Sequence, residues 1–241
     1  MKDCFIESNG ANMCIDWKES FRLINNEILT PTNITSRIDA SIRTFRVKNF
    51  FKILPTYSAL WNREVWGITS AKCPRCMIEE ETWDHIWICG NNELNNSEFN
   101  LFKESILEVL SYLMTDESDD KSIKEFEEKL FEVASTRSIL MSPDNMLREL
   151  TRGIVNEKWI SVCVSGSQKN TLREIFDMYL GKIQSRIWIE RCNETVELEK
   201  QMGIFRDLKR KRREERSEDA EGRGKKENLE NYKNKKKLKK C

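Results

Sequence analysis

Glycine, proline and histidine are scarce in this chain. Its 241 residues include 9 glycines, 4 prolines and a single histidine. Folds that are built from strands and tight turns need more glycine and proline, because these residues supply the backbone angles of turns. The composition therefore favours a mainly α-helical fold.

Long apolar runs are lacking too. The first residues, "MKDCFIESNGANMCIDW", hold no apolar stretch of signal-peptide length. No segment of the sequence approaches the roughly 20 apolar residues that a membrane helix needs. We therefore expect an intracellular protein with no membrane partner. In a reducing compartment its 8 cysteines would be thiols or metal ligands rather than disulfides.

The net charge of +1 conceals separate basic and acidic regions. Residues 37–75 carry 8 basic and 2 acidic side chains, and residues 206–241 carry 16 basic and 8 acidic ones. Residues 77–157 instead carry 19 acidic and 7 basic side chains. The basic regions favour a polyanion such as RNA or DNA, whereas the acidic middle region favours a basic protein partner.

Apolar residues recur at helical spacing along most of the sequence. This pattern predicts helices over residues 16–29, 35–54, 56–66, 97–114, 122–134, 142–160 and 171–202, with a turn at 166–170. Asp16 is expected to cap the first helix, and Pro143 to lie in the first turn of the sixth. The predicted apolar faces include Trp17, Phe21, Ile24 and Ile28; Ile38, Ile42, Phe45 and Phe50; and Leu172, Phe176, Tyr179, Ile183 and Ile187.

The stretch "KCPRCMIEEETWDHIWIC", residues 72–89, places the only histidine among three cysteines. Cys73 and Cys76 form a Cys-x-x-Cys pair, which can hold two thiolates at one tight turn. His85 and Cys89 are four residues apart, so they share one face of a helix that Thr82 can cap.

Three cysteines and one histidine make a closed tetrahedral set of ligands for Zn²⁺. A closed set leaves no position for water, so the metal would stabilise the fold rather than act in catalysis. One alternative is an amphipathic helix with a buried His and Cys beside an incidental Cys-x-x-Cys. A redox Cys-x-x-Cys is another, and it would require a preceding strand and a helix directly after it.

Together these patterns predict three regions. Residues 1–95 form a helical segment with the zinc knuckle, residues 96–205 form a helical region, and residues 206–241 form a charged tail. Apolar residues nearly vanish beyond Phe205, so the tail is expected to be disordered. The predicted fold is an irregular, mainly α-helical assembly with one small zinc knuckle.

Residues 43–90 combine a basic helix, a Leu-Pro-Thr phrase, a short helix, Cys-Pro-x-Cys, an acidic phrase and His-Ile-x-x-Cys. In this they resemble the zinc-binding region that lies downstream of the reverse transcriptase in non-LTR (LINE-like) retrotransposon proteins. The resemblance implies a structural zinc ion and assistance to a reverse transcriptase through binding of template RNA or target DNA. The matching residues are Lys48, Leu54, Pro55, Thr56, Cys73, Pro74, Cys76, Glu81, Thr82, His85, Ile86 and Cys89.

Enzymatic motifs are missing from this chain. The Asp119–Asp120 pair follows Glu117 and Ser118, so it lacks the aromatic residue of a polymerase motif. No nucleophile–base pair or phosphate-cradling glycine loop is evident. We therefore expect a non-catalytic, nucleic-acid-binding remnant or derivative of a retrotransposon. The alternatives are an all-helical protein-interaction module stabilised by zinc and a decayed fragment without selected function.

Basic residues flanking the motif are the candidates for contact with phosphates. Trp61, Trp66 or Trp83 could offer a surface for stacking of bases. The alternatives are a solvated basic face and tryptophans in the core. The predicted nucleic-acid-binding residues are Arg43, Arg46, Lys48, Lys52, Lys72 and Arg75. Arg37 lies with Arg43, Lys48 and Lys52 on one face of the helix predicted over residues 35–54.

Two basic runs lie near the end of the sequence, at residues 209–213 and 233–240. Each could be a nuclear localisation signal, a nucleic-acid-binding tail or a solubilising segment. The candidate nuclear localisation signal consists of Lys209, Arg210, Lys211, Arg212 and Arg213.

Overall fold

The computed structural model describes residues 15–27, 36–112 and 120–210. These parts are mainly helical, as the composition predicted, and they contain isolated β-bridges but no strand. None of their helices combines the length and the apolar character that a membrane span requires. The predictions for residues 211–241 lie outside the described residues.

The helices are short except for α2, α5, α6 and the long segment near the end of the described part. In chain order they are α1 (Trp17–Ile24), α2 (Arg37–Phe50), α3 (Tyr57–Asn62), α4 (Trp83–Ile88), α5 (Glu98–Ser111), α6 (Asp120–Ser135), α7 (Met146–Thr151), α8 (Glu157–Ser161), α9 (Gly166–Lys182), the π-helical segment η3 (Ile183–Ile189), α10 (Glu190–Gln201) and α11 (Arg206–Lys209).

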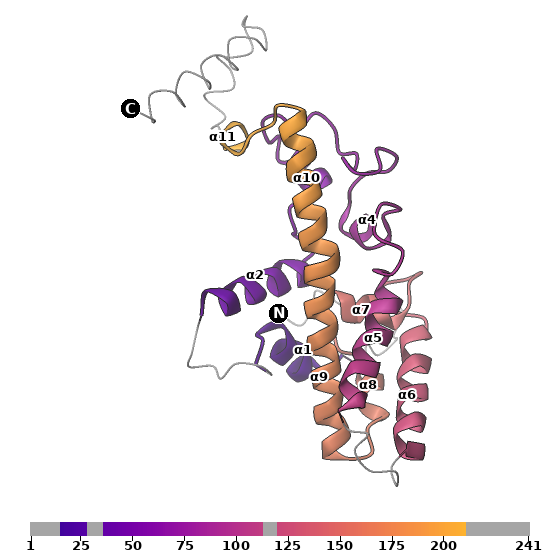
Figure 1. Cartoon of the computed structure of the whole chain (residues 1–241). Helices are drawn as coiled ribbons and strands as arrows, with labels where there is room; N and C mark the ends of the chain where they lie inside the picture. The colour runs from indigo at the N-terminus through magenta and orange to yellow at the C-terminus, as the bar shows by residue number, and fades with distance from the viewer. Residues whose placement is uncertain (1–14, 28–35, 113–119, 211–241) are drawn as a thin grey trace, which may run out of the picture.

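A single long helix runs through the molecule. Figure 1 shows α9, η3 and α10 following one another without a break, with α1 and α2 on one side and α5 to α8 on the other. The predicted stripe of Leu172, Phe176, Tyr179, Ile183 and Ile187 is buried, which confirms that prediction.

The turn that was predicted at residues 166–170 is wrong. These residues form the first turn of α9. The side chain of Ser165 caps the helix, because its hydroxyl accepts a hydrogen bond from the backbone N–H of Gln168 at 3.1 Å. The cap satisfies a donor that would otherwise be free at the helix start, so the helix begins earlier than the apolar pattern indicated.

One continuous apolar cluster forms the main core. It joins Leu23 of α1, Phe45 of α2 and Trp83 of α4 to residues from α5 to α9, such as Phe102 and Tyr179. Residues on both sides of position 96 therefore share one core. The aromatic rings of Phe102 and Tyr179 meet edge to face at a centroid distance of 5.4 Å.

The buried face of α1 agrees only in part with the predicted one, since Ile24 is buried as expected. Asp16 caps the helix as expected, but Trp17 and Phe21 are 38% and 52% exposed. Glu19 is buried instead, because its carboxylate accepts hydrogen bonds from Arg173 of α9 at 2.6 and 2.8 Å. This ion pair joins α1 to α9 through the face of α1 that carries Glu19. The two aromatic side chains lie on the other side, towards solvent.

The apolar face of α2 is only partly as predicted. Phe45 and Phe50 are buried, whereas Ile38 is 75% exposed and Ile42 is half-buried. Ile28 lies outside the described residues.

The helix that was predicted over residues 142–160 is divided in two. Gly153 has a φ of 89°, a left-handed conformation that ends the first part, α7. Asn145 caps α7 by accepting a hydrogen bond from the N–H of Arg148 at 3.3 Å, and Asn156 caps α8. Pro143 therefore precedes the cap and does not lie in the first turn.

Candidate metal centre

The Cys-x-x-Cys pair lies in a small, closed loop. An antiparallel bridge joins Lys72 to Glu80, and the N–H of Cys73 donates to the carbonyl of Glu79 at 2.8 Å. These bonds fold residues 72–80 back on themselves. The sulfur atoms of Cys73 and Cys76 are thereby brought to the same side of the loop.

Helix α4 supplies the other two side chains. The hydroxyl of Thr82 accepts a hydrogen bond from the N–H of His85 at 3.1 Å, which confirms the predicted cap. Trp83 and Trp87 pack edge to face at 5.5 Å and anchor the helix in the core. His85 lies inside α4, whereas Cys89 is the first residue after it.

The four predicted ligands come together in space. Their ligating sulfur and nitrogen atoms all lie within 4.8 Å of one another. The sulfurs of Cys73 and Cys89 are 3.9 Å apart, and the sulfur of Cys76 is 3.5 Å from Nε2 of His85. In a tetrahedral zinc site, bond lengths of about 2.3 Å to sulfur and about 2.0 Å to nitrogen imply separations of about 3.8 Å and about 3.5 Å. The cluster therefore fits a tetrahedrally bound metal ion.

The three thiols differ in their electrostatic environments. Burial raises the pKa of Cys73 to about 12 and also raises the pKa of Cys89. Burial acts in the same sense on Cys76, but hydrogen bonds from the backbone N–H groups of Glu79 and Ile78 and from the side chains of Cys73 and His85 together outweigh it, so its pKa falls to about 6. A metal cation among the sulfurs would offset the cost of burying the thiolates.

A carboxylate orients the histidine. The Nδ1 atom of His85 lies 3.0 Å from a carboxylate oxygen of Glu79. This contact fixes the hydrogen on Nδ1 and leaves Nε2 free to face Cys76. Metal-bound histidines almost always have such a partner on the second nitrogen. The sequence pattern missed this role, because three consecutive glutamates at 79–81 look alike in the sequence.

A buried ion pair connects the cluster to the long helix. Glu81 is 1% exposed, and one of its carboxylate oxygens accepts a hydrogen bond from Nε of Arg191 in α10 at 2.8 Å. The same oxygen is 3.8 Å from the sulfur of Cys73. Its second oxygen accepts from the N–H of Tyr57 at 2.7 Å. The Cys/His cluster, the start of α3 and α10 are thus tied together at one carboxylate.

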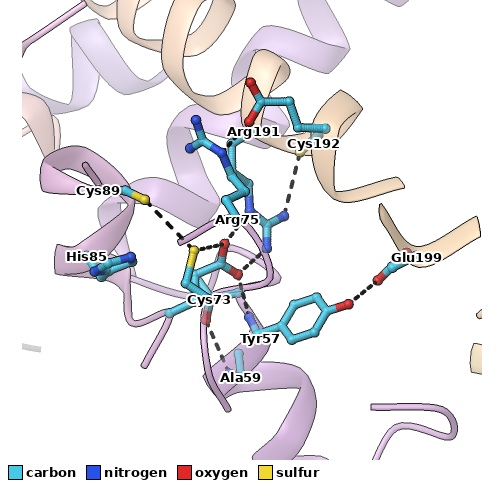
Figure 2. A network of polar contacts seen from close by, with 12 residues as sticks. Tyr57, Ala59, Cys73, Arg75, His85, Cys89, Arg191, Cys192 and Glu199 are labelled. Atoms are coloured by element: carbon cyan, nitrogen blue, oxygen red, sulfur yellow. Dashed lines mark hydrogen bonds and ion pairs between the residues drawn. The ribbon is translucent and has the colours of Figure 1, made fainter. Parts of the chain in front are cut away.

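The network continues towards the end of the described chain. Figure 2 shows the hydroxyl of Tyr57 directed at Glu199, to which it donates at 3.1 Å. Lys209 of α11 donates to the other carboxylate oxygen of Glu199 at 2.6 Å. This network was not evident from the sequence, because two residues that it joins, Glu81 and Arg191, are 110 residues apart.

Two of the six predicted phosphate-contacting residues, Arg46 and Arg75, form ion pairs within the protein. Arg46 is 3% exposed and forms an ion pair with Asp177 at 2.6 Å. The side chain of Arg75 is 4% exposed, pairs with Glu194 and donates to Asn92 at 2.8 Å. Both guanidinium groups are engaged in contacts within the protein in this structure.

The other four basic residues retain some exposure. Lys48 and Lys72 are exposed. Lys52 is half-buried, lies 3.3 Å from Asp84 and places its ammonium 4.5 Å from the centre of a Trp83 ring. Arg43 is half-buried and forms an ion pair with Asp39 in the same helix.

The three tryptophans that could stack on bases differ in their exposure to solvent. Trp83 is 5% exposed and donates its indole N–H to Asn49 at 2.8 Å, so it cannot stack on a base. Trp61 is 46% exposed and Trp66 is half-buried. In the basic run at 209–213, Lys209 is paired with Glu199, Arg210 is exposed, and residues 211–213 lie outside the described residues.

Comparison of the chain with protein-family models, with curated proteins and with solved structures finds no match. The resemblance to a retrotransposon region therefore depends on the sequence motifs alone. The clustering of the four side chains has independent support, because the fold brings their ligating atoms within 4.8 Å of one another.

Proposed function

We propose that this protein binds nucleic acid without catalysis and that one structural Zn²⁺ ion stabilises its fold. The observation that carries the metal assignment is the clustering of the ligating atoms of Cys73, Cys76, His85 and Cys89 within 4.8 Å of one another. Thiolate and imidazole ligands favour zinc among the common metals. Four protein ligands leave no open position for a reacting water, so the ion supports a structural role.

The ligand set has a direct spectroscopic test. Replacement of zinc by cobalt should give the absorption of a tetrahedral cobalt–thiolate centre. The Cys76→Ser variant should weaken the thiolate-to-metal band, whereas Cys163→Ser, which changes a half-buried cysteine far along the chain, should leave it unchanged. An octahedral cobalt spectrum would contradict the assignment.

The basic surface around α2 and the knuckle supports the nucleic-acid part of the proposal. Arg37, Lys48, Arg63 and Lys72 are exposed, and they belong to the stretch with 8 basic and 2 acidic residues. Exposed lysines and arginines bind phosphates and release counterions. The resemblance of residues 43–90 to a retrotransposon zinc-binding region points to the same class of ligand.

Salt dependence tests this proposal. Binding of labelled single-stranded and duplex oligonucleotides would be measured by fluorescence anisotropy between about 50 and 300 mM salt. We expect the affinity to fall steeply as salt rises, because each phosphate contact releases counterions. The absence of salt-dependent binding at protein concentrations up to about 10 μM would contradict the proposal.

A second candidate function, a protein-interaction module, is favoured by apolar side chains around the knuckle. Met77, Ile78 and Ile88 are 63%, 76% and 63% exposed. The same titration separates the candidates, since a module that binds only a protein partner would show no salt-dependent binding of the oligonucleotides.

A further inference from the structure

A groove lies between α2 and the π-helical segment η3. It has a volume of about 420 Å³. Arg37, Thr44 and Lys48 of α2 line one wall, and Gln184 and Trp188 of η3 line the other. π-helical turns inside long helices occur frequently at functional sites, which makes this wall a candidate for ligand contact.

The groove is cationic at both ends. Arg37 and Lys48 are exposed and eleven residues apart in α2, close to three helical turns, so they lie on one face about 16 Å apart along the axis. The α2 residues between them that line the groove include Ala40, Ser41 and Thr44, whose small side chains leave the groove open. Among the described residues that line it, none is acidic.

An indole lines the groove beside Phe45. Trp188 is half-buried and packs against Phe45, which also lines the groove, at a ring-centroid distance of 6.3 Å. The exposed part of the indole offers an apolar, aromatic contact, and the amide of Gln184 next to it can donate and accept hydrogen bonds. Cations that flank an aromatic side chain are typical of surfaces that bind unpaired nucleotides.

We infer that this groove binds a short stretch of single-stranded nucleic acid. Arg37 and Lys48 contact its phosphates, and a base lies against Trp188. The distance of about 16 Å between the cations corresponds to about five nucleotides at a helical spacing of ~3.4 Å and to fewer in an extended strand. In a duplex the bases are stacked inside, so they cannot reach the indole. The inference rests on the proposed nucleic-acid-binding function and specifies where and what the protein binds.

The test uses the full-length protein and a labelled single strand of about 12 nucleotides. The double variant Arg37→Ala/Lys48→Ala removes both groove cations. The matched control, Lys121→Ala/Lys129→Ala, removes two exposed lysines of α6 and changes the net charge equally. Each contact with a phosphate of a single strand contributes about 0.7 to the magnitude of the slope of log affinity against log salt. The slope of the groove variant should therefore be smaller in magnitude by about 1.4.

We expect the groove variant to bind the single strand at least about tenfold more weakly at low salt, with the control unchanged. Trp188→Phe should keep more affinity than Trp188→Leu at equal thermal stability, because only phenylalanine retains a ring. If the groove variant bound nucleic acid with the same salt slope as the wild type, the inference about the groove would be wrong, while the proposed function would stand. A wild type that binds no nucleic acid would overturn both.

Competition identifies the class of ligand. An unlabelled single strand should displace the labelled one more effectively than the same sequence as a duplex or than a poly-glutamate peptide. Stronger competition by the duplex or by the acidic peptide would overturn the inference.

Discussion

The glutamates at positions 79, 80 and 81 have three different roles in the fold. Glu79 contacts Nδ1 of His85, the side chain of Glu80 is exposed, and Glu81 is buried against Arg191. The spacing of cysteine and histidine sufficed to predict that Cys73, Cys76, His85 and Cys89 come together. It could not assign these glutamates, because their roles depend on how the loop folds back and on a helix more than a hundred residues later.

Removal of the Glu79 carboxylate should weaken metal binding. Glu79→Ala leaves Nδ1 of His85 without its partner, so the ring is less well oriented and less basic. We expect the metal affinity to fall by about 10- to 100-fold, as measured by competition with a chromophoric chelator. Glu80→Ala is the control and should bind metal like the wild type. Equal affinities in the two variants would contradict a role for Glu79.

A largely buried carboxylate outside the Cys/His cluster, that of Glu98, should make stability depend on pH. Burial raises the pKa of Glu98 to about 6 from 4.5, although Arg148 lies 2.9 Å away and opposes the shift. Since the folded-state pKa is the higher one, the folded state holds this proton more tightly. Its stabilising contribution is full below pH 4.5 and is lost as the pH rises through about 6.

The variant Glu98→Gln is uncharged at every pH, so it should gain stability relative to the wild type on going from about pH 5 to about pH 7.5. The expected gain is on the order of 1–2 kcal/mol in the free energy of unfolding, measured with urea. A difference between the two proteins that does not change with pH would show that Glu98 does not carry this shift.

At the scale of single helices, the sequence predicted the helix caps better than it predicted which face of a helix is buried. The caps at Asp16 and Thr82 and the buried stripe of the long helix follow from neighbouring residues, and these predictions were correct. For the buried face of α1 the prediction was right for Ile24 but wrong for Trp17 and Phe21, because α1 is oriented by an ion pair between Glu19 and Arg173 of α9. Apolar periodicity alone does not register a charged side chain that is buried through a distant partner.

The ion pair between Glu81 and Arg191 should matter more for stability than an exposed one. Arg191→Leu leaves the Glu81 carboxylate buried without its partner, so we expect a loss of about 3–5 kcal/mol in the free energy of unfolding. The double variant Arg191→Leu/Glu81→Gln should be more stable than the single variant. Its neutral amide oxygen can still accept the hydrogen bond from Tyr57.

Urea denaturation of the metal-loaded proteins measures both variants. The control is Lys200→Ala, which breaks the exposed pair between Lys200 and Glu197 and should change the stability by less than about 1 kcal/mol. If Arg191→Leu were no more destabilising than this control, α10 would not be held through Glu81.

At the scale of the whole molecule, the metal cluster and the groove are connected. The guanidinium of Arg191, which is bound to Glu81, also lies 5.2 Å from the centre of the Trp188 ring. Composition and periodicity predicted the mainly helical fold. They did not predict that residues on both sides of position 96 share one core, because such contacts join segments far apart in the sequence.

This connection predicts a joint effect of metal removal. A chelator should lower the midpoint of thermal unfolding and weaken the binding of single-stranded nucleic acid together, and added zinc should restore both. Glu80→Ala should respond like the wild type. A loss of stability with full retention of nucleic-acid binding would show that the groove does not depend on the metal.

The metal content of the purified protein tests the central claim most directly. Elemental analysis of the wild type should find about one zinc per chain, and Cys73→Ser or His85→Ala should lose it. A wild-type protein that contains no metal, and whose thermal unfolding is unchanged by zinc or by a chelator, would contradict the account.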